Sequence, residues 1–266
     1  MGNPLINSLA SLLLLSLFFG SIQVWRHVVQ RWQSGLPALF PEPRNTSQWS
    51  MLTSVPTVGL VVVFGLLSFI PNPEPGVPSL ETIQFSCLLN VLLFVVLMAL
   101  LSRLGTQNVA PMGVRLAGWK SEVEIGFWAF LASLAPISAM LILMLPFRTE
   151  ETQHSFLKLL QGTDGLEVAF WIFLAAAVLA PLVEELMFRV VLQGWLETKI
   201  APNYAIGLPA VFFCAIHGWP DSIPLLPLAL ILGYTFQRTH SYIAVISTHF
   251  FFNFSNLLLV MMAKIS

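Results

Sequence analysis

The sequence predicts an all-α fold, a polytopic transmembrane bundle of about eight helices. Hydrophobic residues make up 56% of the chain, charged residues only 9%, and the mean hydropathy is +0.81. A soluble domain carries about 25% charged residues, so this chain of 266 residues has too few charges to cover a water-soluble surface. The lipid bilayer must therefore solvate much of the protein. The net charge of -1 argues against a nucleic-acid partner.

Four uncharged apolar stretches in the first half of the chain are long enough to cross a membrane. They cover approximately residues 4–25, 51–70, 83–102 and 125–147. Each reaches the roughly 20 residues that a transmembrane helix needs. The first stretch is predicted to be a helix and not a secretory signal, because no Lys or Arg precedes it.

Four further apolar stretches in the second half are each shortened or interrupted by proline or polar residues. They are 168–183, which ends just before Glu184; 203–217, with Pro209 and His217; 223–236, with Pro224 and Pro227; and 242–262, with His249 and Asn253. The unusual polar residues of this charge-poor chain therefore gather in its last four predicted helices.

The distribution of basic residues supports this count. If the eight helices alternate in direction, nine of the twelve Lys and Arg residues fall on one side of the membrane. Basic loops favour the cytoplasmic side. We therefore expect a multi-pass integral membrane protein, in the plasma (inner) membrane if the cell is bacterial, with both termini on the non-cytoplasmic side. The basic residues on that side are Arg148, Lys158 and Lys264.

The first polar group is Glu184, Glu185 and Arg189, which follow Pro181. Ionisable residues at membrane depth are costly, so they need a reason. Glu185 and Arg189 are four residues apart, so they share a helix face and can pair. Glu184 points about 100° away without a nearby cation, which suits a general base. A kink at Pro181 could admit water. The alternative is a charged helix end at the cytoplasmic surface.

Two further polar groups lie on later helices, Phe213 with His217 and His249 with Asn253. Each pair is four residues apart and so shares a helix face. His249 and Asn253 can both point at one oxygen, as in an oxyanion site or a metal-ligand pair. Alternatively, His217 is a helix-end histidine, and His249 and Asn253 bond two packed helices. Polar groups in a membrane seek one another or water, so we expect the three groups to converge.

In this order on successive helices, the three motifs resemble those of the CAAX-protease and bacteriocin-processing family. This family includes the type II CAAX prenyl endopeptidases and is also called the ABI or glutamic intramembrane protease family. The resemblance covers approximately residues 168–262. It implies a catalytic membrane core at 125–266, after family-variable transmembrane helices at 1–124. The motifs are EExxxR (Glu184, Glu185, Arg189), FxxxH (Phe213, His217) and HxxxN (His249, Asn253).

The resemblance also implies how the first two motifs act. Glu184 would activate a water molecule, and Glu185 would assist it while held in place by Arg189. His217 would help to position or polarise that water. In the eukaryotic members, the cut removes the last three residues after a prenylated cysteine.

The third motif would stabilise the transition state, because His249 and Asn253 would bind the tetrahedral oxyanion. Phe213 would line the substrate cavity. By this analogy the reaction needs no cofactor. The alternative is a zinc site with Glu184, His217 and His249 as ligands, although a conventional HExxH motif is absent.

We therefore expect an intramembrane endopeptidase that cuts near the C-terminus of a membrane-associated substrate, with or without a prenyl group. Its partners would be the lipid bilayer and a protein or peptide substrate. One alternative is a non-catalytic peptide-binding or bacteriocin-immunity-type membrane protein. Another is a proton-coupled transporter with Glu184 and His249 as a relay, but the two halves of the sequence show no inverted repeat.

Overall fold

The computed structural model describes residues 4–40, 49–67, 78–104, 118–147, 165–218 and 222–265, with a few single residues between these ranges. All regular secondary structure in this part of the chain is helical. The helices outside the central one are α1 (Pro4–Gln33), α2 (Met51–Leu67), α3 (Leu80–Leu104), α4 (Trp119–Met144) with the 3₁₀ turn η2 (Leu145–Phe147), α9 (Pro202–Ile216), α10 (Ser222–Thr239) and α11 (Tyr242–Ile265).

The central helix, residues 166–196, is irregular and consists of five consecutive segments. Two of them, η4 and η5, are π-helical, a rare geometry that often lies at functional sites. They flank the short α7 turn, which carries Glu184 and Glu185. Pro181 in this turn has no backbone N–H to donate, so the regular helical pattern is interrupted. The segments are α6 (Leu166–Ile172), η4 (Phe173–Leu179), α7 (Ala180–Glu185), η5 (Leu186–Gln193) and α8 (Gly194–Leu196).

The helices confirm the all-helical prediction and most of its boundaries. Each of the eight predicted stretches coincides with a helix within the described residues. Five of these helices are long and apolar enough to cross a membrane, namely α1, α3, α4, the central helix and α11. The apolar helices α2 and α9 have only 17 and 15 residues. A total of eight membrane crossings therefore remains a prediction.

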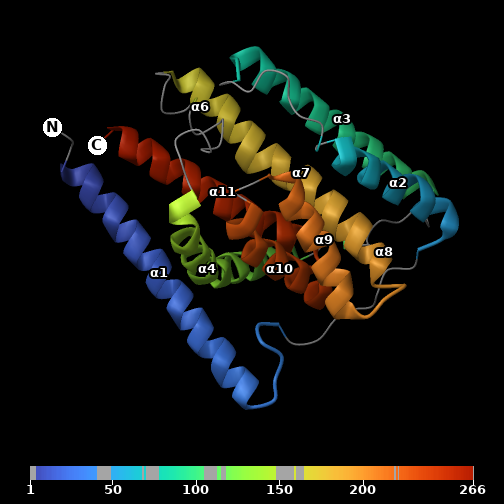
Figure 1. The fold of residues 1–266 in the computed structure, drawn as a ribbon, viewed down its shortest axis with the longest axis horizontal. Coiled ribbons are helices and arrows are strands. Elements are labelled where there is room, and N and C mark those ends of the chain that lie inside the picture. Colours follow the sequence, from blue (N-terminus) through green and yellow to red (C-terminus); the bar gives the residue numbers. More distant parts are fainter. Residues whose placement is uncertain are drawn as a thin grey trace.

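The central helix lies between two groups of helices (Figure 1). On one side it packs against α2 and α3, and on the other side against α11. The α4 helix packs against α10 and α11, and α1 packs against α4. The first three helices therefore flank the remainder of the protein. The proposed division at residue 125 remains a prediction.

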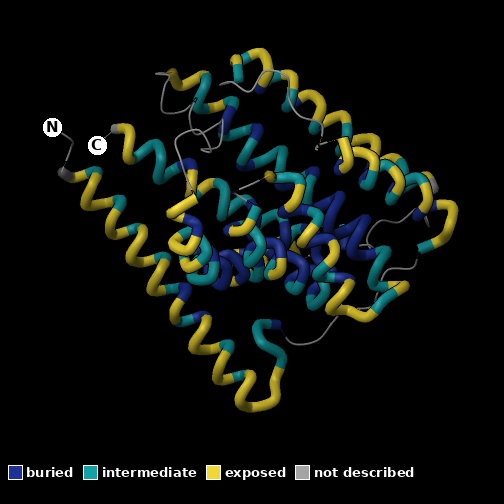
Figure 2. The backbone as a smooth tube through the Cα atoms, viewed as in Figure 1, coloured by how far each residue is buried: buried dark blue, intermediate teal, exposed yellow. Residues whose placement is uncertain are grey.

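Buried residues concentrate around η5, α10 and the first half of α11 (Figure 2). By contrast, only 6% of the residues in the most apolar stretch of α1 are buried. Exposed apolar side chains along α1 and α3 present the kind of surface that a bilayer covers. The polar residues of the three motifs lie on the central helix, α9 and α11, in or beside this most buried region.

Candidate active site

Glu185 is at the centre of the polar network, and its side chain is 0% exposed. Its Oε1 atom accepts a hydrogen bond from Nδ1 of His249 at 2.8 Å. Its Oε2 atom lies 3.2 Å from Nε of Arg189, as the spacing of four residues predicts. A buried carboxylate needs such partners, because an unpaired buried charge is strongly destabilising.

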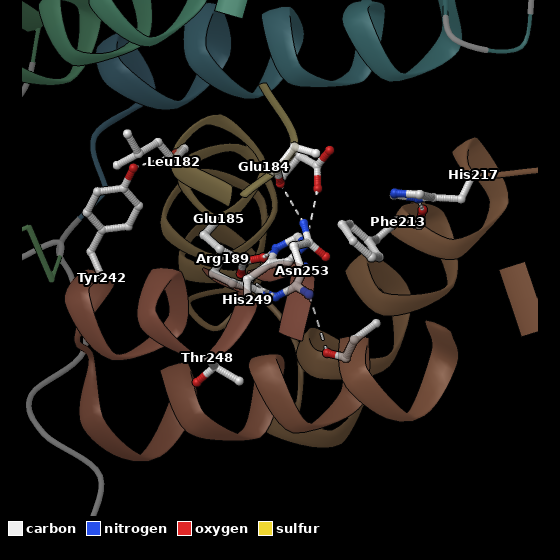
Figure 3. A network of polar contacts seen from close by, with 12 residues as sticks. Leu182, Glu184, Glu185, Arg189, Phe213, His217, Tyr242, Thr248, His249 and Asn253 are labelled. Atoms are coloured by element: carbon white, nitrogen blue, oxygen red, sulfur yellow. Dashed lines mark hydrogen bonds and ion pairs between the residues drawn. The ribbon is translucent and has the colours of Figure 1, made fainter. Parts of the chain in front are cut away.

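Glu184 lies beside this network but remains accessible, with 24% of its side chain exposed. Its Oε2 atom is 3.8 Å from Nε2 of His249. This distance is too long for a direct hydrogen bond, and a water molecule beside both atoms could bond to each of them. In Figure 3 the Glu184 carboxylate points toward the His249 and Asn253 side chains. The His249 ring therefore presents one nitrogen to each glutamate.

Arg189 and Phe213 pack against the other residues of the network. The Arg189 side chain is fully buried, and its Nη2 atom lies 3.5 Å from the Ala229 carbonyl oxygen of α10. Its guanidinium carbon is 5.1 Å from the centre of the Phe213 ring, a favourable cation–π geometry. The centres of the Phe213 and His249 rings are 5.9 Å apart. Packing on Phe213 thus fixes both partners of Glu185.

Asn253 connects α11 to the central helix, because its Nδ2 donates to the Ala176 carbonyl oxygen at 2.8 Å. At the end of η4, the Ala180 N–H bonds to the carbonyl of Ala175, five residues earlier. The next donor in that register would be Pro181, which has no N–H. Asn253 supplies the missing donor. A side-chain amide has two N–H donors, so one hydrogen remains for a ligand.

His217 lies outside the direct network. Its Nδ1 atom is 2.7 Å from the Phe213 carbonyl oxygen, and the two rings are 4.5 Å apart at their centres. In Figure 3 the Phe213 ring lies between His217 and the His249 cluster. The first and third motifs therefore meet directly, as expected, whereas the second reaches them only through Phe213. Nε2 is the His217 nitrogen left for a water or a substrate.

The zinc alternative requires three ligands that converge on one ion. Of the three residues proposed, only Glu184 and His249 lie close together, and Nδ1 of His217 is already bonded to a backbone carbonyl. Within the described ranges, no group of three His, Cys, Asp or Glu residues is placed to hold a metal. The residues as arranged do not fit a zinc site.

One contact in this region involves Tyr242, a residue outside the three motifs that was not predicted to belong to the site. The hydroxyl of Tyr242 donates a hydrogen bond to the Leu182 carbonyl oxygen, in the turn that carries both glutamates. A signal was present in the sequence, because Tyr242 lies seven residues before His249. That spacing is two helical turns, so the two side chains share a face of α11.

The fold and the site together define a class of protein, a helical membrane protein with a glutamate–histidine–arginine network beside the π-helical segments of its central helix. Residues 166–255 match the family model described as type II CAAX prenyl endopeptidase Rce1-like. The resemblance seen in the three motifs is thereby confirmed, and the family whose model matches this region is one of membrane proteases. It includes every predicted site residue. No curated protein and no solved structure matched the chain.

Proposed function

We propose that this protein is an intramembrane endopeptidase that cleaves a membrane-associated protein or peptide near its C-terminus, with prenylated CAAX-type proteins as the substrate class. The observation that carries this proposal is the contrast between two adjacent glutamates around one histidine. Glu185 is buried and doubly paired, whereas Glu184 is partly exposed and has no direct hydrogen bond to His249. The match of residues 166–255 to a peptidase family supports the same conclusion.

Glu184 is the general base in this proposal. A base must reach the water that it activates, and only Glu184 of the two glutamates is exposed. Both carboxylate oxygens of Glu185 are already engaged, by His249 and by Arg189. Glu185 therefore orients His249 and does not take part in proton transfer with a substrate.

The proposed reaction transfers one proton through Glu184. Glu184 takes a proton from water while the water oxygen attacks the peptide carbonyl carbon, and a tetrahedral oxyanion forms. Collapse of that intermediate breaks the C–N bond. Glu184 then returns its proton to the leaving amine, so that the products are a carboxylic acid and an amine and the enzyme is restored.

His249 and Asn253 stabilise the oxyanion in this scheme. The Nδ1–H of His249 is held by Glu185, so Nε2 is the nitrogen that faces the reacting groups. In this scheme a proton on Nε2 is donated as a hydrogen bond to the oxyanion. The free N–H of the Asn253 amide provides a second donor. Such preorganised donors are often the largest contribution to catalysis.

The test compares Glu184→Gln with the unaltered protein in proteoliposomes. The probe is an internally quenched peptide with a farnesylated cysteine and three residues after it. We expect Glu184→Gln to lower kcat by about 10²–10⁴-fold, the usual contribution of a general base. Glu167→Gln is the matched control, because Glu167 is exposed at the start of the same central helix. It should cleave at the normal rate.

Retention of normal cleavage by Glu184→Gln would show that the base is wrongly assigned. A biological phenotype that survives in Glu184→Gln, without cleavage by either protein, would favour the peptide-binding or immunity-type alternative. An unprenylated version of the same peptide tests the substrate class, since cleavage at an equal rate would remove prenylation from the proposal.

A further inference from the structure

We propose that Tyr242 is a positioning residue for Glu184, acting through the carbonyl group of Leu182. The inference rests on the proposed peptidase function and adds a residue outside the three motifs. The hydroxyl of Tyr242 donates to the Leu182 carbonyl oxygen, two residues before Glu184 (Figure 3). The same oxygen also accepts the backbone N–H of Leu186. The turn closed by Leu182 and Leu186 is the one that holds both glutamates.

Within the central helix, this turn is the part that depends most on a contact from a neighbouring helix. The π-helical segments η4 and η5 end and begin on either side of it, at Leu179 and Leu186. Pro181 within it has no N–H to donate. Backbone bonding inside the helix is therefore irregular where Glu184 is held, and a donor from a neighbouring helix adds a fixed reference point.

The α11 helix, which supplies this donor, contacts the central helix along a single face. Tyr242 bonds Leu182, His249 bonds Glu185, and Asn253 bonds Ala176. These three α11 residues are separated by seven and four positions, which places them in one line on the helix. Tyr242 therefore belongs to the same contact surface as the two motif residues of α11.

Tyr242 is itself held firmly. It is 5% exposed, and its backbone N–H donates to the Gly113 carbonyl oxygen at 2.9 Å. The preceding turn includes His240, whose Nε2 lies 3.2 Å from Oε2 of Glu197 just after α8. A Cβ atom on Gly113 would be only 2.7 Å from the His240 carbonyl oxygen. The start of α11 is thus attached to two other segments. The hydrogen bond from the Tyr242 hydroxyl therefore ties the Leu182 carbonyl oxygen to a well-anchored helix end.

Removal of the Tyr242 hydroxyl should displace the turn that carries Glu184 more than it lowers the stability of the protein. In Tyr242→Phe the Leu182 oxygen still accepts the Leu186 N–H, so no buried carbonyl loses its only donor. The ring also keeps its packing. A displacement of about 1 Å at a reacting group can lower the rate about 100-fold. For the partial release of one turn, we expect kcat to fall about ten-fold, with KM unchanged.

The experiment measures kcat and KM of Tyr242→Phe in proteoliposomes with the farnesylated quenched peptide. The matched control is Tyr234→Phe, because within the described structure the Tyr234 side chain stacks on Phe40 and has no hydrogen bond. We expect the control to keep normal kcat, and both variants to unfold in detergent at the normal temperature. A normal kcat in Tyr242→Phe, or a change in KM alone, overturns the inference.

A double variant tests whether Tyr242 acts through Glu184. Glu184→Asp shortens the side chain and already displaces the carboxylate, so adding Tyr242→Phe should lower kcat by less than it does in the unaltered protein. Fully multiplicative losses would contradict the inference. If the unaltered protein and Glu184→Gln both fail to cleave the peptide, the proposed function itself is wrong, which is a different outcome from cleavage that is insensitive to Tyr242.

Discussion

At the scale of single residues, Glu184 and Glu185 are neighbours in sequence but have opposite environments. Side chains of adjacent helical residues point about 100° apart, so one faces the interior and the other an accessible side. Glu185 is paired with Arg189 and His249, and Glu184 keeps an exposed carboxylate. This division allows one acid to orient the site and the other to exchange protons.

The buried pair leads to a prediction for Arg189→Met, which keeps the length of the side chain but removes its charge. Glu185 would lose its ion-pair partner while it remains buried. Breaking such a pair on one side costs about 3–5 kcal/mol, so the free energy of unfolding in detergent should fall by about that amount. Lys199→Met, at an exposed position beyond the same helix, is the control and should change it little.

Adding Glu185→Gln to Arg189→Met removes the stranded charge. The double variant should therefore be more stable than the sum of the two single losses predicts. Additive losses would mean that the ion pair does not couple the two residues. The measurement is the same denaturant titration.

At the scale of helices, the position of α11 depends on close contact with α4. A Cβ atom on Gly126 would lie 2.6 Å from the Ala244 carbonyl oxygen and 2.6 Å from Cβ of Ser247. Thr248 also donates a hydrogen bond to the Gly126 carbonyl oxygen at 3.1 Å. Small residues allow such close approach between membrane helices. This contact with α4 therefore helps to keep the face of α11 that carries His249 against the central helix.

We therefore expect Gly126→Ala to push α4 and α11 apart. Forced overpacking costs about 1–3 kcal/mol, and the unfolding free energy should fall within that range. The cleavage rate should fall as well, because α11 carries two of the proposed donors. Gly207→Ala is the control, since no atom lies within 4 Å of the added Cβ on α9. Equal stability of the two variants would argue against close packing at Gly126.

At the scale of the whole molecule, the direction of the chain across the membrane depends on how many helices cross it. Five helices are long and apolar enough to cross, and an odd number of crossings would put the two ends on opposite sides. With all eight helices crossing, the two ends share a side. The described ends of α1 and α11 lie on the same side of the molecule in Figure 1.

Nine of the twelve basic residues fall on one side in the eight-helix arrangement, so we expect both termini on the opposite, non-cytoplasmic side. Topology reporters fused separately to each end should both report that location. A reporter fused in the loop between α3 and α4 should report the cytoplasm. Termini on opposite sides would show that an odd number of helices crosses and that the eight-crossing arrangement is wrong.

The sequence by itself determined the helices and the local pairs. A chain in a bilayer must satisfy its backbone within each segment, so hydropathy alone predicts where helices lie. The eight predicted stretches accordingly coincide with helices in the described residues. The pairing of Glu185 with Arg189 also follows from local geometry, because a spacing of four residues places both on one helix face.

Only the tertiary structure decided which distant side chains meet. The contact between His249 and Glu185 joins residues 64 positions apart, and the bond from Tyr242 to Leu182 spans 60 positions. No local periodicity encodes such distances, because they depend on how helices rotate and pack against one another. For the same reason the sequence could not predict that Phe213 separates His217 from His249, or that Asn253 replaces the donor that Pro181 lacks.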